Sequence, residues 1–83
     1  MCWYLYILQC ADDTLYTGIT TDLVRRVKEH NCDNKLGAKS LRGKRPVRVI
    51  YREIYQNRME AAKREKAIKN WTREGKLNLI KRA

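Results

Sequence analysis

The stretch WYLYILQCADDTLYTGIT, residues 3–20, decides the fold. Residues 3–8 and 14–19 are short runs of aromatic, β-branched and aliphatic side chains, which favour extended strands. The polar sequence Ala11-Asp12-Asp13 separates them, and its aspartates favour a turn. The stretch therefore predicts a β-hairpin.

The register of this hairpin decides which tyrosines share a face of the sheet, because side chains alternate along a strand. A three-residue loop at residues 12–14 places Tyr6, Tyr16 and Gly18 on the same face. A two-residue loop at residues 12–13 places the two tyrosines on opposite faces. A site that uses both phenols requires the first arrangement.

The remaining sequence predicts a third strand and further helices. We expect a helix over residues 22–30, a loop over 32–46, a strand over 47–52, a helix over 58–71, and a shorter segment that Gly75 interrupts and Ile80 ends. The order is β-β-α-β-α with a short C-terminal helix. We therefore expect an α/β (α+β) fold, a small three-stranded antiparallel sheet flanked by helices, in a single domain of residues 1–83.

The composition indicates a polyanionic partner. Lys and Arg number 19 against 9 Asp and Glu, which gives a formal net charge of +10. Nucleic acid is the first candidate. An anionic membrane surface is the second, but it requires a long amphipathic basic helix or a lipidation signal, and neither is evident. The longest apolar run, residues 2–8, is far too short to span a bilayer. The three cysteines lack CxxC spacing, so they support neither a zinc site nor a disulfide framework. We expect a cytoplasmic protein.

A basic run occupies residues 34–52, which contain no acidic side chain. Such a run is typical of a surface that contacts phosphates, where binding releases counterions and carries no sequence readout. The alternative is an ordinary solvated basic face. The members of the run are Lys35, Lys39, Arg42, Lys44, Arg45, Arg48 and Arg52.

Glu65 falls on the apolar side of its predicted helix, one turn after Ala61 and Ala62 and one turn before Ile68. A carboxylate in that position needs a partner. One alternative is an ion pair with Lys69, four residues further along the helix. The other is a hard cation such as Mg²⁺, which proteins commonly hold with one or two carboxylates plus water and substrate phosphate.

Tyr4, Tyr6 and Tyr16 crowd into the hairpin of a chain that has no Phe, so the phenolic oxygen is a candidate functional group. Strand propensity explains aromatic residues there equally well. Arg26 could favour the phenolate of a nearby tyrosine or hold a phosphate, and its alternative is an ordinary exposed helix arginine.

With these residues in place, the sequence resembles the GIY-YIG superfamily and its short stand-alone branch. The first motif matches Tyr4-Leu5-Tyr6, with Tyr4 in place of glycine, and the second matches Tyr16-Thr17-Gly18. Arg26 matches the helix arginine, and Glu65 matches the glutamate of the late helix. Further matches are Thr20, His30, Gly37-Ala38-Lys39, Arg45-Pro46, Ala61 and Lys69.

The resemblance implies an endonuclease that hydrolyses phosphodiester bonds in DNA. Its catalytic residues would be Tyr6, Tyr16, Arg26 and Glu65, with one Mg²⁺ or Mn²⁺ ion on Glu65. Tyr16 is the expected general base, Tyr6 orients water or phosphate, and Arg26 stabilises charge in the transition state. The expected substrate-binding residues are Tyr4, Gly18, Thr20, His30, Lys35, Lys39, Arg42, Lys44 and Arg45.

The expected substrate is branched or damaged DNA in repair or recombination, with DNA favoured over RNA and specificity supplied by a partner protein or by DNA shape. The rival interpretation belongs to another class of protein: a non-catalytic module that binds DNA or RNA through the basic run. Binding that weakens with salt is expected of both, whereas dependence on a divalent cation separates them.

Overall fold

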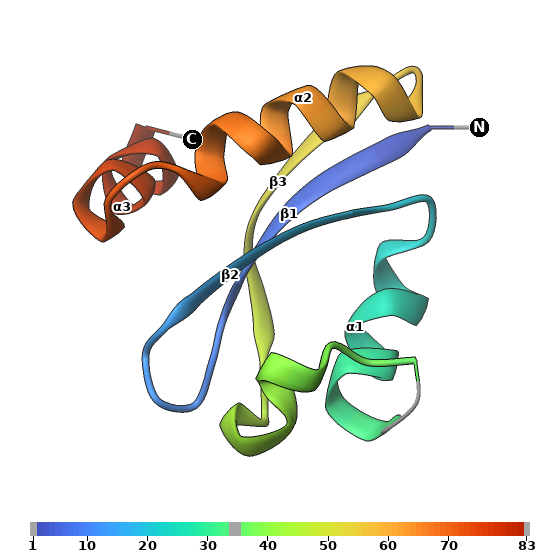
Figure 1. Ribbon diagram of the computed structural model, residues 1–83, viewed down its shortest axis with the longest axis vertical. Helices are drawn as coiled ribbons and strands as arrows, with labels where there is room; N and C mark the ends of the chain where they lie inside the picture. The colour runs from blue at the N-terminus through green and yellow to red at the C-terminus, as the bar shows by residue number, and fades with distance from the viewer. Residues whose placement is uncertain (1, 34–35, 83) are drawn as a thin grey trace.

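An antiparallel sheet forms the centre of the molecule (Figure 1), a computed structural model that describes residues 2–33 and 36–82. The sheet contains β1 (Trp3–Gln9), β2 (Leu15–Thr20) and β3 (Arg48–Tyr55) in the order β2-β1-β3. β1 lies in the middle and pairs with a strand on each side. The predicted hairpin and third strand are confirmed, although β3 continues to Tyr55 rather than ending at residue 52.

The hairpin loop comprises residues 11–13, so the expected loop at 12–14 is wrong by one position. The Cys10 amide donates to the Thr14 carbonyl and the Asp13 amide to the Cys10 carbonyl, both at 2.9 Å. Asp13 adopts a φ of 68°, a left-handed conformation that aspartate tolerates better than most residues. Shifting a three-residue loop by one position changes the strand pairing by two residues, so the predicted faces are preserved.

The connection between β2 and β3 contains α1 (Leu23–Cys32) and the 3₁₀ helix η1 (Lys39–Lys44). Asp22 caps α1 by accepting a hydrogen bond from the Arg25 amide at 3.1 Å. α1 runs two residues beyond the predicted end, and the prediction of a plain loop over 32–46 is wrong at η1. The 3₁₀ turn forms because Leu41 packs into the core and is only 2% exposed.

The last quarter of the chain forms α2 (Arg58–Lys69) and α3 (Arg73–Arg82). Asn57 caps α2 by accepting from the Glu60 amide at 2.9 Å. α2 ends two residues before the predicted residue 71. Gly75 does not interrupt the final segment, because it lies in the first turn of α3 and its amide donates to Thr72 Oγ1 at 3.2 Å. Among the described residues, no helix is long and apolar enough to cross a bilayer.

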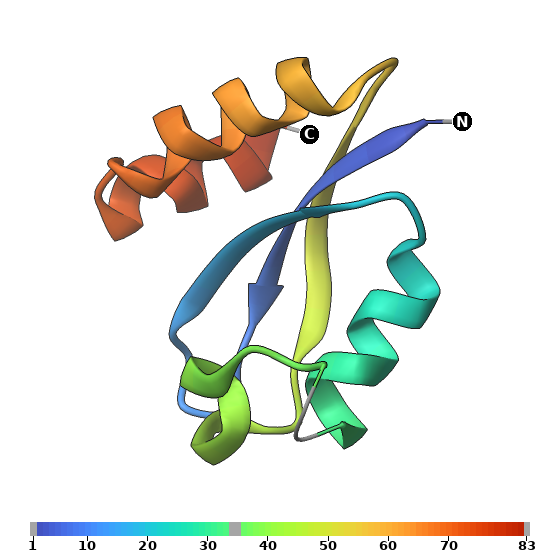
Figure 2. The ribbon, with the colours of Figure 1, turned by 45° about the vertical axis from the view of Figure 1, so that its right-hand side comes forward.

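Helices cover both faces of the sheet (Figure 2). On the α1 face, Tyr6, Leu8 and Cys10 pack with Leu41 and Val47. On the opposite face, here the α2 face, Leu5 and Ile7 pack with Ile68 of α2. Because β1 is buried on both faces, it contributes to both cores, and its alternate side chains are separated between them.

A polar cluster fastens α2 to β3. Arg64 Nε and Nη2 donate to the Glu53 carboxylate at 3.0 and 3.2 Å, and the hydroxyls of Tyr51 and Tyr55 donate to the same group. Burial acts to raise the pKa of Glu53, but the hydrogen bonds from Arg64 and the two tyrosines outweigh it and the pKa is lowered. This cluster fixes how α2 is rotated on the sheet.

The Thr17 hydroxyl is buried on the α2 face and has no hydrogen-bond partner among the described residues. Replacing it with the isosteric Val removes an unsatisfied polar group, so Thr17→Val is expected to raise the free energy of unfolding by about 1 kcal/mol. Urea denaturation measures the change. Thr20→Val is the matched control, since the Thr20 hydroxyl is also buried but bonds to Asp22, and it should destabilise the protein. Equal changes in the free energy of unfolding for the two substitutions would contradict the interpretation that the Thr17 hydroxyl is an unsatisfied buried group.

Candidate active site

The register of β1 and β2 places both motif tyrosines on the α1 face. Tyr6 lies opposite Gly18, and Leu8 lies opposite Tyr16. The rings of Tyr6 and Tyr16 are tilted by 35° with their centroids 6.5 Å apart. The same-face arrangement that a shared site requires is therefore present.

His30 of α1 packs between the tyrosines and is fully buried. Its ring centroid lies 6.0 Å from that of Tyr6 and 5.3 Å from that of Tyr16. His30 Nε2 lies 2.9 Å from the Tyr6 hydroxyl oxygen, and the Ala38 amide donates to Nδ1 at 3.2 Å. One histidine thus connects β1, α1 and the start of η1.

The contact from Ala38 fixes the tautomer of His30. Because Nδ1 accepts a hydrogen bond, it carries no proton, and the neutral ring must carry its proton on Nε2. Nε2–H therefore donates to the Tyr6 oxygen, which leaves the hydroxyl proton of Tyr6 available to another acceptor. From the sequence, His30 was expected to contact phosphate directly. In the structure both of its ring nitrogens form hydrogen bonds within the protein, and one of them bonds to Tyr6.

Tyr6 remains protonated at neutral pH. Burial, together with the neighbouring Tyr16, raises its pKa to about 12, against the opposing effect of the Arg26 guanidinium close to its hydroxyl. Gly18 makes room for this ring: a Cβ at position 18 would lie 2.5 Å from the hydroxyl oxygen and 2.6 Å from Cζ of Tyr6. The glycine of the second motif is needed for the tyrosine of the first.

Arg26 is held beside Tyr6 by two contacts. Its Nη1 donates to Glu29 Oε1 at 2.9 Å and to the Leu36 carbonyl. Its side chain remains 26% exposed, so the guanidinium is both fixed and reachable from solvent. This geometry suits a group that stabilises negative charge on a bound phosphate.

Glu65 lies on α2, which packs on the opposite face of the sheet from the tyrosines. Its negative charge is one of the influences that raise the pKa of Tyr6. Its carboxylate pairs with Lys69 Nζ at 3.4 Å, the ion pair that its spacing in the sequence allowed. The side chain is 23% exposed, which leaves the carboxylate accessible to a cation from solvent.

The described members of the basic run lie in different environments. Lys39 is exposed, whereas Lys44 Nζ contacts Thr14 Oγ1 at 3.3 Å and Asp12 at 3.8 Å. Arg45 donates to the carbonyls of His30 and Asp33 at 2.6 and 3.1 Å, so it supports the end of α1. Lys35 lies outside the described residues, and so does the side chain of Arg42.

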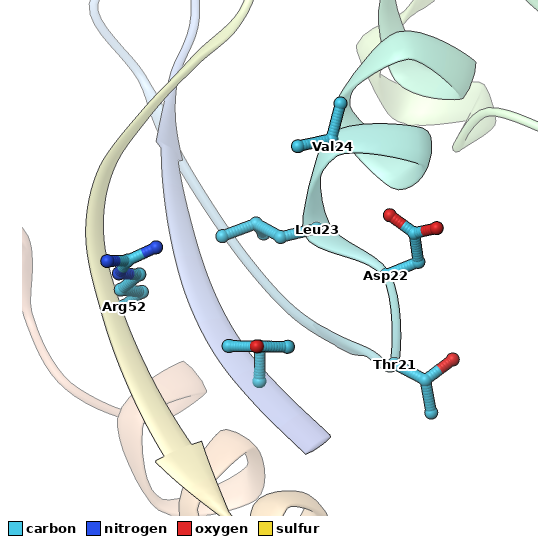
Figure 3. Close-up of a pocket in the computed structure, with 6 residues that line it drawn as sticks. Thr21, Asp22, Leu23, Val24 and Arg52 are labelled. Carbon is cyan, nitrogen blue, oxygen red and sulfur yellow. The ribbon is translucent and has the colours of Figure 1, made fainter. Parts of the chain in front are cut away.

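Tyr4 and Thr20 lie at the other end of the site. Thr20 bonds to the amide and carbonyl of Asp22 and so supports the start of α1. Tyr4 lines a groove of about 240 Å³ together with Arg52, Thr21, Asp22, Leu23 and Val24. Figure 3 shows Arg52 and Leu23 pointing toward each other across this groove, while the Asp22 carboxylate points away from the sheet. Arg52 is the pairing partner of Tyr6, so the groove begins next to the tyrosines.

Comparison with known proteins agrees with this geometry. The sequence profile of the GIY-YIG catalytic domain matches residues 2–78, and the chain therefore belongs to the GIY-YIG family. Membership of this nuclease family indicates nucleic acid as the partner, in line with the net charge.

The chain is similar to UPF0213 proteins. It is 53% identical to one from Desulfotalea psychrophila over 79 residues, covering 95% of this chain and 71% of that protein. It is 51% identical to one from Clostridium perfringens, covering 93% of this chain and 81% of that protein. The solution NMR structure of a UPF0213 protein from Bacillus halodurans superimposes with a TM-score of 0.62 at 38% identity, covering 98% of this chain and 84% of that one.

Sequence reasoning missed Lys76 of α3, whose neighbourhood includes Lys69 of α2. Burial and the charge of Lys69 lower the pKa of Lys76. The charge of Lys69 acts on Lys76 across the turn between α2 and α3, which no helical or strand periodicity predicts. Arg52 was part of the basic run, but only the strand register shows that it borders Tyr6.

The contact between Gly18 and Tyr6 makes Gly18→Ala a test of the packing. The added methyl group has to displace the Tyr6 ring, so we expect the free energy of unfolding to fall by about 1–3 kcal/mol. Thermal and urea denaturation measure this loss. Gly43→Ala is the control, because a Cβ there meets nothing within 4 Å, and it should change stability by less than about 0.5 kcal/mol.

His30 predicts a pH dependence of stability. Burial lowers its pKa to about 4, whereas an unfolded histidine titrates near about 6.5. Between these values the unfolded chain binds more protons, so the stabilisation is present above about pH 6.5 and is lost as the pH falls toward 4. We expect the parent to lose about 2 kcal/mol more than His30→Gln between pH 7 and pH 4 in urea denaturation. Identical pH profiles for the two proteins would be the contrary result.

Proposed function

We propose that the protein is a divalent-metal-dependent endonuclease that hydrolyses phosphodiester bonds in DNA. The observation that carries this proposal is the placement of Tyr6, Tyr16 and His30 in mutual contact on one face of the sheet, with the Arg26 guanidinium beside Tyr6. A buried histidine that donates to one phenol, next to a second phenol and a fixed arginine, is an arrangement suited to moving a proton near a phosphate.

The two tyrosines have different roles in this mechanism. Tyr16 is half-buried, so water can reach its hydroxyl, and it is the proposed general base toward the attacking water. Tyr6 is 1% exposed and keeps its proton at neutral pH. Because it accepts from His30, Tyr6 donates its own hydroxyl proton to the water or to a phosphate oxygen and so orients the reacting groups.

Arg26 stabilises the negative charge that develops on the phosphate oxygens in the transition state. Glu65 is the proposed ligand of one Mg²⁺ or Mn²⁺ ion, which when bound supplies positive charge to a non-bridging phosphate oxygen. Glu65 offers a partly exposed carboxylate, the oxygen ligand that such an ion prefers. Among the described residues no three His, Cys, Asp or Glu side chains gather together, so Glu65 would share the ion with water and phosphate.

The substrate surface combines the exposed Lys39 with the groove formed by Tyr4 and Arg52, on either side of the tyrosines. Lys39 and Arg52 would bind the phosphate backbone of the nucleic acid, and Tyr4 would stack on a base. The net charge of +10 supports the same class of substrate. Branched or damaged DNA, of the kind processed in repair or recombination, is the proposed target.

The second candidate is a non-catalytic module that binds DNA or RNA. One observation favours it: the Glu65 carboxylate is neutralised by Lys69 within the protein itself, as in an idle site. Such a module would bind nucleic acid equally well with and without a divalent cation.

Cleavage assays separate the two candidates. Supercoiled plasmid, single-stranded DNA, branched DNA and structured RNA are incubated with Mg²⁺ or Mn²⁺, and we expect Glu65→Gln and Tyr16→Phe each to lower the cleavage rate at least about 100-fold. Glu60→Gln, exposed on the same helix, is the matched control for Glu65→Gln and should retain activity. Nucleic-acid binding that persists in the two inactive variants would assign the loss to chemistry. Binding without cleavage of any substrate by the parent would favour the second candidate.

A further inference from the structure

Glu65 and Lys69 form an ion pair on α2. The two residues lie four positions apart on α2, with the glutamate nearer the N-terminus, the more favourable order on a helix. Lys69 Nζ lies 3.4 Å from Glu65 Oε2. The Lys69 side chain is 51% exposed, so the ammonium can leave the carboxylate and enter solvent without disturbing the core.

A cation that binds Glu65 has to compete with this ammonium. Glu65 is the carboxylate of the proposed metal site, and the described residues contain no cluster of three His, Cys, Asp or Glu side chains that could hold the ion. A site with so few protein ligands holds Mg²⁺ or Mn²⁺ weakly until phosphate oxygens complete it. In such a site, a lysine that pairs with the carboxylate weakens the binding of the divalent cation.

Displacement from Glu65 leaves the Lys69 ammonium without its carboxylate partner. The side chain is 51% exposed, so the ammonium can reach a ligand in solvent. An exposed ammonium on a chain of net charge +10 is suited to the phosphate of a phosphodiester backbone.

We propose that Lys69 is the resting counter-ion of Glu65: it occupies the carboxylate until a divalent cation displaces it, and the released ammonium then binds a backbone phosphate. This inference rests on the proposed metal dependence and adds a regulatory step to it. Metal and nucleic acid would bind cooperatively, because the metal frees the lysine that the phosphate needs.

The first test measures Mn²⁺ affinity by electron paramagnetic resonance on protein without nucleic acid. Lys69→Met removes the competing ammonium and should tighten Mn²⁺ binding about two- to fivefold, the range expected for a partly exposed ion pair. Lys66→Met is the matched control: it removes the same charge from the same helix but lies outside the pair, so it corrects for the lower net charge. Glu65→Gln should abolish the binding.

The second test measures the affinity of a short DNA strand by fluorescence anisotropy in Mn²⁺, with Tyr16→Phe added to every protein to prevent cleavage. Here Lys69→Met should weaken binding severalfold and reduce the salt dependence by about one phosphate contact. Lys69→Arg should retain the affinity. A substitution that raises the affinity for Mn²⁺ and lowers the affinity for DNA cannot act by a general loss of structure. Equal melting temperatures check that the fold is intact.

The outcomes separate this inference from the function on which it rests. If Glu65→Gln binds Mn²⁺ as the parent does, the metal site at Glu65 is wrong and both proposals fail. If Glu65→Gln loses Mn²⁺ but Lys69→Met binds it no more tightly than Lys66→Met, the metal site stands and the counter-ion role of Lys69 is overturned. If Lys69→Met leaves the affinity for DNA unchanged, the proposed contact between Lys69 and a backbone phosphate is wrong.

Discussion

The hydrogen bond between His30 and Tyr6 is the constraint on which the site depends. It joins the central strand to α1 inside the core, at 2.9 Å, and the Ala38 amide on the opposite nitrogen determines the direction of the proton. A buried polar pair of this kind stabilises the fold only while every partner is present, because an unpaired group in the core is costly. Gly18 provides the space in which the Tyr6 ring lies. The residues of the candidate site are therefore also residues that pack the α1 face.

The opposite face contributes to the site through the orientation of α2. Arg64 points to the Glu53 cluster on β3, and Glu65 is the next residue along the helix. Consecutive residues on an α-helix are separated by about 100° of rotation. When Arg64 is anchored, the direction of Glu65 is set as well, toward the side from which its charge reaches Tyr6.

Local features such as helix starts and strand alternation could be predicted from the sequence. Contacts between residues far apart in the sequence could not. Asp22 predicted the start of α1. The alternation in residues 3–20 left two registers open, and the observed pairing is one that places Tyr6 and Tyr16 on the same face. The loop was misplaced by one residue because Asp13, rather than a glycine, adopts the left-handed conformation. η1 was missed because a single side chain, Leu41, holds it against the core, and one apolar residue gives no period. The hydrogen bonds from Arg45 to the carbonyls of His30 and Asp33 arise from tertiary packing, which composition and spacing do not encode.

The position of β1 also has a consequence for the synthesis of the chain. β1 is the first strand made, yet its pairing with β3 joins Trp3 to Tyr55. While the ribosome translates the intervening residues, the hairpin and α1 can form, but one edge of an apolar strand stays open and the α2 face stays uncovered. The positive charge of the chain opposes association of such intermediates with one another. The complete sheet, and with it the alignment of Tyr6 and Glu65, forms only when most of the chain has left the ribosome.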